Sequence, residues 1–144
     1  MSENEKNNLK PVEFGVPVTY DECKEEISSI QRRIIEDGGP FLPDKSVANV
    51  IIPVFRGDTV IGFGFLFVRD DYVDIMRMVD PDEQGQGVGK LLLIQLEKWT
   101  KGIGVEEVHS YILDSKQSAQ DAMEKAGYVI SRREQGRILY VKKL

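Results

Sequence analysis

Apolar residues recur every three or four positions between residues 20 and 36, and this spacing is typical of an amphipathic helix. The predicted buried stripe of that helix consists of Cys23, Ile27, Ile30 and Ile34. Further helices are predicted over residues 88–101 and 114–126, and in the second of these Asp114 and Gln117 have the spacing of a capping box. We therefore expect helices that each bury one face, with Cys23 as a core residue rather than a reactive thiol.

Alternation of large and small or polar residues indicates strands, and it is clearest over residues 60–68. One face of this strand is expected to carry Ile61, Phe63, Phe65 and Phe67, and the other Val60, Gly62, Gly64, Leu66 and Val68. The two glycines predict the close approach of a helix or of another backbone. The other predicted strands span residues 12–18, 47–55, 72–79, 107–113, 128–133 and 137–142. This order of elements predicts a mixed α/β sheet with helices on both faces.

The composition suits one globular domain, because the chain has 144 residues, of which 41% are hydrophobic and 30% are charged. We predict a disordered polar tail at residues 1–10 and a single domain over residues 11–144. The formal net charge of −5 argues against a nucleic-acid partner, since such binding relies on clustered Lys and Arg. The single cysteine excludes an internal disulfide, and no apolar run has the length of a membrane span. The polar N-terminus is unlike a signal peptide, so we expect a cytoplasmic protein.

A glycine-rich segment, Gln84–Gly89, connects a predicted strand to a predicted helix. Backbone N–H groups at a helix start have no intrahelical partner, and with the positive end of the helix dipole they suit a phosphate. Glycine lets such a ligand approach where a Cβ would block it. A Walker loop does not fit, because Gln84 replaces its first glycine and Leu91 its metal-binding hydroxyl. The fingerprint Gly-x-Gly-x-x-Gly fails as well, since Lys90 and Leu92 stand where its third glycine is required.

The pattern that remains, Gln-x-x-Gly-x-Gly, resembles the acetyl-coenzyme A loop of the GNAT superfamily of N-acetyltransferases. The segment Met78–Pro81 precedes the loop at the family's usual distance, and the segment Ala119–Tyr128 resembles the family's second motif. The resemblance covers residues 47–144. It implies an acyl-CoA N-acyltransferase-like fold, which is a mixed, mostly antiparallel central sheet with helices on both faces.

The resemblance also implies where acetyl-CoA, as the co-substrate, is bound. In that family the strand before the loop separates from its neighbour, and main-chain groups there hold the pantetheine arm and the acetyl carbonyl. The cofactor contacts implied for this chain are Met78, Val79, Gln84, Gly85, Gln86, Gly87, Val88, Gly89, Lys90 and Ser115. An alternative for Lys90 is a solvated helix lysine.

Acetyl transfer to an amine requires a base, because a free amine with a pKa of about 10 is mostly protonated at neutral pH. Asp74 is the nearest acidic candidate on the strand before the loop, although the family's strand carboxylate stands one residue earlier, at Val73. The family often has a tyrosine acid where this chain has Met123, which fits an apolar helix face. Tyr111 and Tyr128 are candidate substitutes for that acid, and packed aromatic side chains are the alternative.

His109, the only histidine, has no Cys or carboxylate at ligand spacing, so we predict no metal site and a structural or surface imidazole. The predicted function is an acetyl-CoA-dependent N-acetyltransferase whose acceptor, a small-molecule or protein amine, attacks directly in a ternary complex. The alternative is a non-catalytic module that binds acyl-CoA and regulates another process. A homodimer is one assembly that the sequence leaves open.

The acceptor is expected near the segment Gly38–Asp44, because the resembled fold places such a segment over the acceptor cleft. Its apolar wall candidates are Phe41 and Leu42, and Asp37 and Asp44 are carboxylates suited to a cationic acceptor. Asp70 and Asp71, in the turn before the cofactor strand, are further candidates. The alternative for all these acids is a solvated surface.

Overall fold

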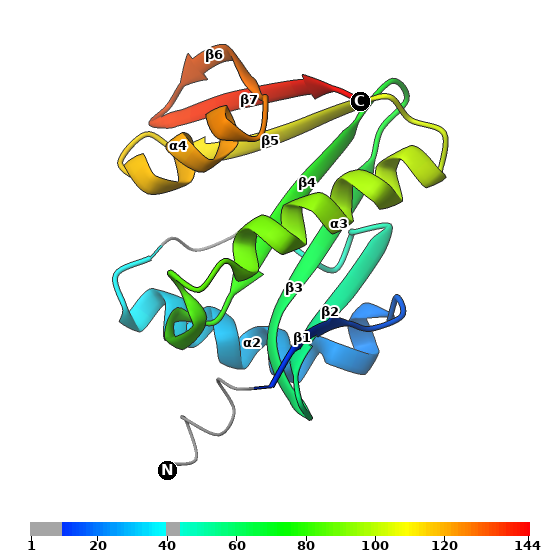
Figure 1. Cartoon of the computed structure of the whole chain (residues 1–144), viewed down its shortest axis with the longest axis vertical. Coiled ribbons are helices and arrows are strands. Elements are labelled where there is room, and N and C mark those ends of the chain that lie inside the picture. Colours follow the sequence, from blue (N-terminus) through cyan, green and yellow to red (C-terminus); the bar gives the residue numbers. More distant parts are fainter. Residues whose placement is uncertain (1–9, 40–43) are drawn as a thin grey trace.

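The computed structural model describes residues 10–39 and 44–144 (Figure 1). The order of helices and strands agrees with the order expected from the hydrophobic pattern. The elements are β1 (Val12–Phe14), α2 (Tyr20–Glu36), β2 (Val50–Arg56), β3 (Thr59–Val68), β4 (Val73–Val79), the 3-10 helix η1 (Pro81–Glu83), α3 (Val88–Gly102), β5 (Glu107–Leu113), α4 (Gln117–Lys125), β6 (Val129–Glu134) and β7 (Arg137–Lys143).

In the part of the chain that the structure describes, the central sheet has seven strands in the order β1-β2-β3-β4-β5-β7-β6. Neighbouring strands are antiparallel except for β4 and β5, which are parallel. The β4–β5 ladder is short, with only Val73 opposite Val108 and Asp74 opposite His109. Beyond these pairs the two strands diverge (Figure 1). The mixed, mostly antiparallel sheet is confirmed, and it is open at its centre.

Helices cover both faces of the sheet, as predicted (Figure 1). On one face α2 packs its apolar stripe against the phenylalanines of β3 and against Met78. On the other face α3 packs Leu92, Leu93 and Leu96 against β2, β3 and β4, and α4 adds Met123 to the same core. Burial of apolar surface on the two faces stabilises the sheet and fixes where α3 begins.

The predicted stripe of α2 is confirmed, since all four of its residues are buried. The helix begins with a capping box in which the Glu22 amide donates to the Thr19 hydroxyl. Burial raises the pKa of the Cys23 thiol to about 11 from its ordinary value of 9.0, so this thiol remains protonated at neutral pH. Cys23 is therefore a core residue, as expected.

Two local predictions are wrong. A β-bulge between β2 and β3 shifts the register at Val54, so that Ile61 packs with the α3 core while Val60 packs with the α2 core. The sequence alternation predicted the reverse, with Ile61 on the face of the phenylalanines and Val60 on the other face. The capping box at Asp114 is absent as well, because α4 begins at Gln117 after an N-cap residue, Lys116, that makes no side-chain capping bond.

The glycines of β3 permit close packing, as expected. A Cβ on Gly64 would lie 2.8 Å from carbon atoms of Leu92 and Leu96, so this glycine lets α3 rest directly on the sheet. A Cβ on Gly62 would lie 2.5 Å from the Met78 carbonyl oxygen, which is backbone and has little freedom to move. The β3–β4–α3 unit, which carries the candidate site, therefore depends on both glycines.

Candidate active site

The loop between β4 and α3 is shaped by two glycines in the left-handed region. Gly85 has φ of 80° and Gly87 has φ of 82°, and Gly87 is the N-cap residue of α3. A Cβ added at either position meets no atom within 4 Å. Glycine is therefore required here by backbone conformation and not by crowding, and the space in front of the loop is open.

Six consecutive amide groups of this loop point to a ligand. The N–H groups of residues 85–90 donate to no other residue that the structure describes, and the first helical bond of α3 is from the Leu91 amide to the Gly87 carbonyl oxygen at 3.1 Å. Amides without partners at a helix N-terminus attract an anion, which the helix dipole also favours. Gln84, Gly85, Gln86, Gly87 and Lys90 are exposed, so a phosphate group can reach the loop. The donors and the open space fit a phosphate group.

The base of the loop is held by two ion pairs from distant elements. Arg33 of α2 donates to the Asp80 carboxylate from Nε at 3.0 Å and from Nη2 at 2.6 Å. Arg56 of β2 donates from Nε to Glu83 Oε2 at 3.1 Å, and both side chains are about nine-tenths buried. The Asp80 carboxylate also accepts the Asp82 amide, which starts η1. These contacts fix the chain immediately before Gln84.

The strand opening lies beside the loop. Val79 is opposite Gly62 in β3, so β4 remains bound to β3 along its whole length. On its other side β4 has no strand partner beyond Asp74 among the described residues. Met78 is fully buried beneath α2, and Val79 packs against the α3 core. Both candidate main-chain contacts thus lie on the part of β4 without a β5 partner, and residues 80–84 connect them to the loop amides.

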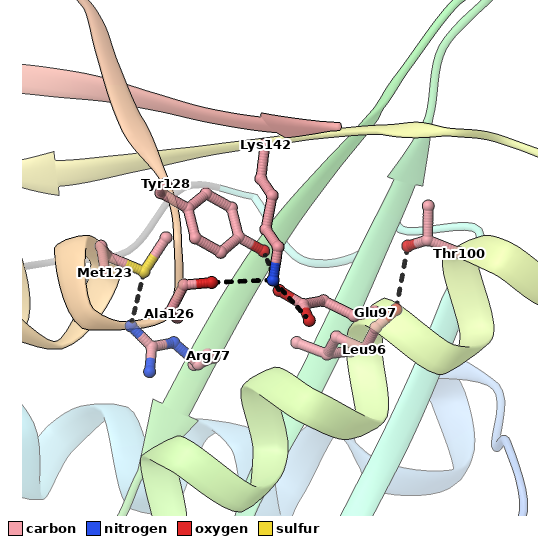
Figure 2. Close-up of polar contacts among 8 residues, drawn as sticks. All are labelled: Arg77, Leu96, Glu97, Thr100, Met123, Ala126, Tyr128 and Lys142. Carbon is pink, nitrogen blue, oxygen red and sulfur yellow. Dashed lines mark hydrogen bonds and ion pairs between the residues drawn. The ribbon is translucent and has the colours of Figure 1, made fainter. Parts of the chain in front are cut away.

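Arg77 is a residue that the sequence analysis did not single out. Its side chain lies on the α3 and α4 side of β4 (Figure 2). Arg77 Nη1 donates to the Gly89 carbonyl oxygen at 3.1 Å. Nη2 lies 3.4 Å from Met123 Sδ. The sequence predicted Arg77 only as one residue of the strand over residues 72–79, and no local signal marks it as a site residue.

A polar cluster lies beside Arg77 (Figure 2). Tyr128 donates its hydroxyl to Glu97 Oε2 at 2.7 Å, and Lys142 Nζ lies 3.2 Å from the same oxygen. Burial, followed by the hydrogen bond to Glu97, raises the pKa of Tyr128 well above its ordinary value. A phenol that holds its proton this strongly is a poor acid, so Tyr128 is better explained as a packed aromatic with a satisfied hydroxyl.

Asp74 lies where β4 and β5 begin to separate. Its carboxylate accepts from Arg69 Nε at 3.2 Å and is 22% exposed. The neighbouring pair, His109 on β5 and Tyr72, stacks with ring centroids 3.8 Å apart. His109 also lies 3.7 Å from Glu107, which agrees with a structural role for the imidazole. Asp74 is therefore a hydrogen-bonded carboxylate at the closed end of the opening.

Tyr111 belongs to a different cluster, formed with the β6–β7 hairpin. Its hydroxyl accepts from Arg132 Nη2 at 3.0 Å and donates to Glu134 at 3.4 Å, and the Arg137 guanidinium lies 4.5 Å from its ring centroid. Tyr111 and Asp74 share no hydrogen bond. The two catalytic candidates that the sequence named thus belong to different hydrogen-bonded clusters.

The remaining predicted residues are mostly exposed. Ser115 is exposed in the turn between β5 and α4. The Asp44 carboxylate accepts from the Ser46 hydroxyl and amide, which lowers the pKa of Asp44. Asp37 is the exposed C-cap residue of α2, while Phe41 and Leu42 lie outside the described residues.

Residues 10–39 and 44–144 contain no group of three or more His, Cys, Asp or Glu side chains that can hold a metal ion. In the same part of the chain, no helix combines the length and the apolar character that crossing a bilayer requires.

Solved structures with the same fold include acetyltransferases. PaiA N-acetyltransferase from Thermoplasma acidophilum, in complex with coenzyme A, has a TM-score of 0.79 and 18% identity, over 93% of this chain and 99% of that chain. YncA from Salmonella typhimurium, with its cofactor acetyl-CoA, has a TM-score of 0.74 and 14% identity, over 94% of this chain and 95% of that chain. The ribosomal-protein-S18-alanine N-acetyltransferase from Escherichia coli has a TM-score of 0.72 and 17% identity, over 92% and 94%.

A search of curated protein sequences found no significant match. The family model of the acetyltransferase (GNAT) family, in contrast, matches residues 18–128, which include α2, the loop and α4. This match covers most of the chain and agrees with the open sheet and the unpartnered loop amides. The chain belongs to the GNAT family of acetyltransferases.

Proposed function

We propose that the protein transfers the acetyl group of acetyl-CoA directly to a primary amine, with donor and acceptor bound at the same time. The observation that carries this proposal is the run of six unpartnered amides at residues 85–90 beside the opening between β4 and β5. In this proposal the amides bind a phosphate, and the edge of β4 that lacks a β5 partner binds the extended thioester arm. The GNAT family match supports the same chemistry.

In this proposal the chain holds the donor mainly through its backbone. The loop amides bind the pyrophosphate, and the unpaired edge of β4 at Met78 and Val79 binds the arm and the acetyl carbonyl. Attack on the thioester places negative charge on that carbonyl oxygen, and a fixed amide N–H there stabilises it. A backbone donor requires no particular side chain, which fits a strand whose side chains at these positions are apolar and packed.

The acceptor is an amine that must reach the thioester in its neutral form. Asp74 is the proposed base, because it is a partly exposed carboxylate at the closed end of the opening. Tyr111 remains a candidate acid, although its cluster with the β6–β7 hairpin gives it a second role in that hairpin. Asp37 and Asp44 are proposed to attract a cationic acceptor.

The test is a thiol-release assay with acetyl-CoA and a broad panel of amines, including polyamines, aminoglycosides and peptide N-termini. We expect release that depends on both the amine and the protein. The Asp74→Asn variant should lower the rate constant at neutral pH by about 100-fold, since general-base catalysis contributes about 10²- to 10⁴-fold. Asp58→Asn, which changes an exposed turn between β2 and β3, serves as the matched control.

Two outcomes would reject the proposal. Coenzyme A binding without release for any amine would favour a non-catalytic acyl-CoA-binding module. Absence of coenzyme A binding would reject both functions.

A further inference from the structure

The Arg77 guanidinium occupies the space between the loop and α4. It contacts two groups from elements that are far apart in sequence, the Gly89 carbonyl oxygen of α3 and the Met123 sulfur of α4. Figure 2 shows the guanidinium pointing away from β4 toward the Met123 side chain. Arg77 directly precedes Met78 and Val79, the main-chain groups beside the strand opening.

The charge of Arg77 has no counter-ion among residues 10–39 and 44–144. No carboxylate of the described residues lies within ion-pairing distance of the guanidinium. Glu97, which belongs to the polar cluster beside it, is already held by Lys142 and Tyr128. Burial lowers the pKa of Arg77, yet an arginine keeps its proton in a protein. A buried cation without a counter-ion is costly, so this arrangement favours the binding of an anion.

The present acceptors of Arg77 are weak or neutral. A thioether sulfur is a poor acceptor and a carbonyl carries no net charge, while a guanidinium has five N–H donors. The contact with Met123 nevertheless shows that Nη2 can donate to a sulfur atom at this position. The loop amides already supply hydrogen-bond donors for the phosphate groups of acetyl-CoA. The guanidinium is therefore available to the sulfur end of that molecule.

Resting on the proposed function, we propose that Arg77 hydrogen-bonds the sulfur of coenzyme A and stabilises the thiolate that departs when the acetyl group is transferred. The amine nitrogen forms a bond to the thioester carbonyl carbon, and the C–S bond breaks. The C–S electron pair passes to the sulfur, where the Arg77 cation holds it. The amine proton passes to the base, and solvent later protonates the thiolate. No tyrosine acid is needed in this arrangement, so Met123 is tolerated where such an acid would stand.

The test measures the pKa of the coenzyme A thiol bound to the protein, by titrating the ultraviolet absorbance of the thiolate. A free thiol of this kind has a pKa of about 8.5. A cation in direct contact should lower the pKa of the bound thiol by about one unit or more. Arg77→Gln should return the pKa of the bound thiol to the free value, whereas Arg77→Lys should keep part of the shift. Arg32→Gln, which removes the same charge from an exposed site on α2, should not change it.

Kinetics provide a second readout. Arg77→Gln should lower kcat by about tenfold or more, with a much smaller change in the KM of acetyl-CoA, because the thiolate forms only as the reaction proceeds. Adding Met123→Tyr to Arg77→Gln should restore part of that loss, since a phenol can protonate the departing sulfur.

The outcomes separate this proposal from the proposed function. Wild-type protein that binds coenzyme A with the thiol pKa of the free compound would overturn the role of Arg77, and this result needs no variant to fold. Weaker coenzyme A binding by Arg77→Gln with an unchanged thiol pKa would place Arg77 on the phosphates and overturn it too. Failure to bind coenzyme A at all would instead reject the proposed function.

Discussion

Replacing Gly87 with alanine should separate the structural role of this glycine from its role in binding. Gly87 has φ of 82° and open space where a Cβ would stand. Gly104, just beyond the other end of α3, has φ of 86° and is equally open. The two substitutions therefore impose the same backbone strain, about 1 to 2 kcal/mol for a left-handed alanine. For a chain of 144 residues that corresponds to a fall in Tm of roughly 3 to 7 °C in both variants.

Only Gly87→Ala should weaken coenzyme A binding. Its methyl group would project from the middle of the run of amides at residues 85–90, where the pyrophosphate is proposed to lie. Loss of one charge-assisted hydrogen bond costs about 1.5 to 3 kcal/mol, which raises Kd by about 10- to 100-fold. Calorimetric titration with coenzyme A at 25 °C, together with thermal unfolding, measures both effects. Folded Gly87→Ala that binds as tightly as Gly104→Ala would refute the assignment of the phosphate site.

Four further substitutions test the packing around the site and the electrostatics of α2. Glu83→Gln should destabilise the fold by about 3 to 5 kcal/mol in chemical denaturation, because it removes the carboxylate that neutralises the buried Arg56 and leaves the hydrogen bond from Arg56 to the Lys10 carbonyl oxygen. Lys24→Gln, in an exposed pair, should cost less than about 1 kcal/mol, and equal effects would contradict this view. Met123→Leu preserves the volume of a fully buried side chain, so it should lower the free energy of unfolding by less than about 1.5 kcal/mol. The rate of thiol release should stay nearly unchanged, and a large loss of rate would show that the Met123 sulfur is needed. The pKa of the Cys23 thiol is about 9 in the unfolded chain and about 11 in the folded chain. The free energy of unfolding should therefore fall by roughly 2 to 3 kcal/mol as the pH rises from 9 to 11. Urea unfolding of Cys23→Ala should show a flatter dependence on pH over the same range.

The hydrophobic pattern predicted the elements well because each is decided locally. The α2 stripe and the alternation of β3 repeat over many residues, and the glycine loop follows directly from a strand and opens a helix. The same local rule failed at Ile61, where one extra residue in a bulge exchanges the two faces of the strand. It failed again at Asp114, because the main chain there pairs with Gly136 and α4 starts three residues later.

The sequence predicted only part of the candidate site. The loop glycines form a contiguous motif, and their open, left-handed geometry agrees with it. The contacts that support the loop join residues 47 and 27 positions apart, Arg33 with Asp80 and Arg56 with Glu83, and no periodicity reports such pairs. The sequence could not identify Arg77 as a candidate site residue for the same reason, since its contacts require α3 and α4 to lie together over β4. The predicted tail, the homodimer and the absence of a nucleic-acid partner stay predictions.

The central claim is that the amides of residues 85–90 hold the phosphates of acetyl-CoA beside the strand opening. An amide-resolved NMR titration of the ¹⁵N-labelled protein with acetyl-CoA tests it most directly, because each backbone N–H reports its own hydrogen bond. We predict that the largest shift changes fall on residues 85–90 and on Met78 and Val79, with little change at the Gly104 end of α3. Saturable binding that leaves the amides of residues 85–90 unshifted, or no binding, would contradict the account.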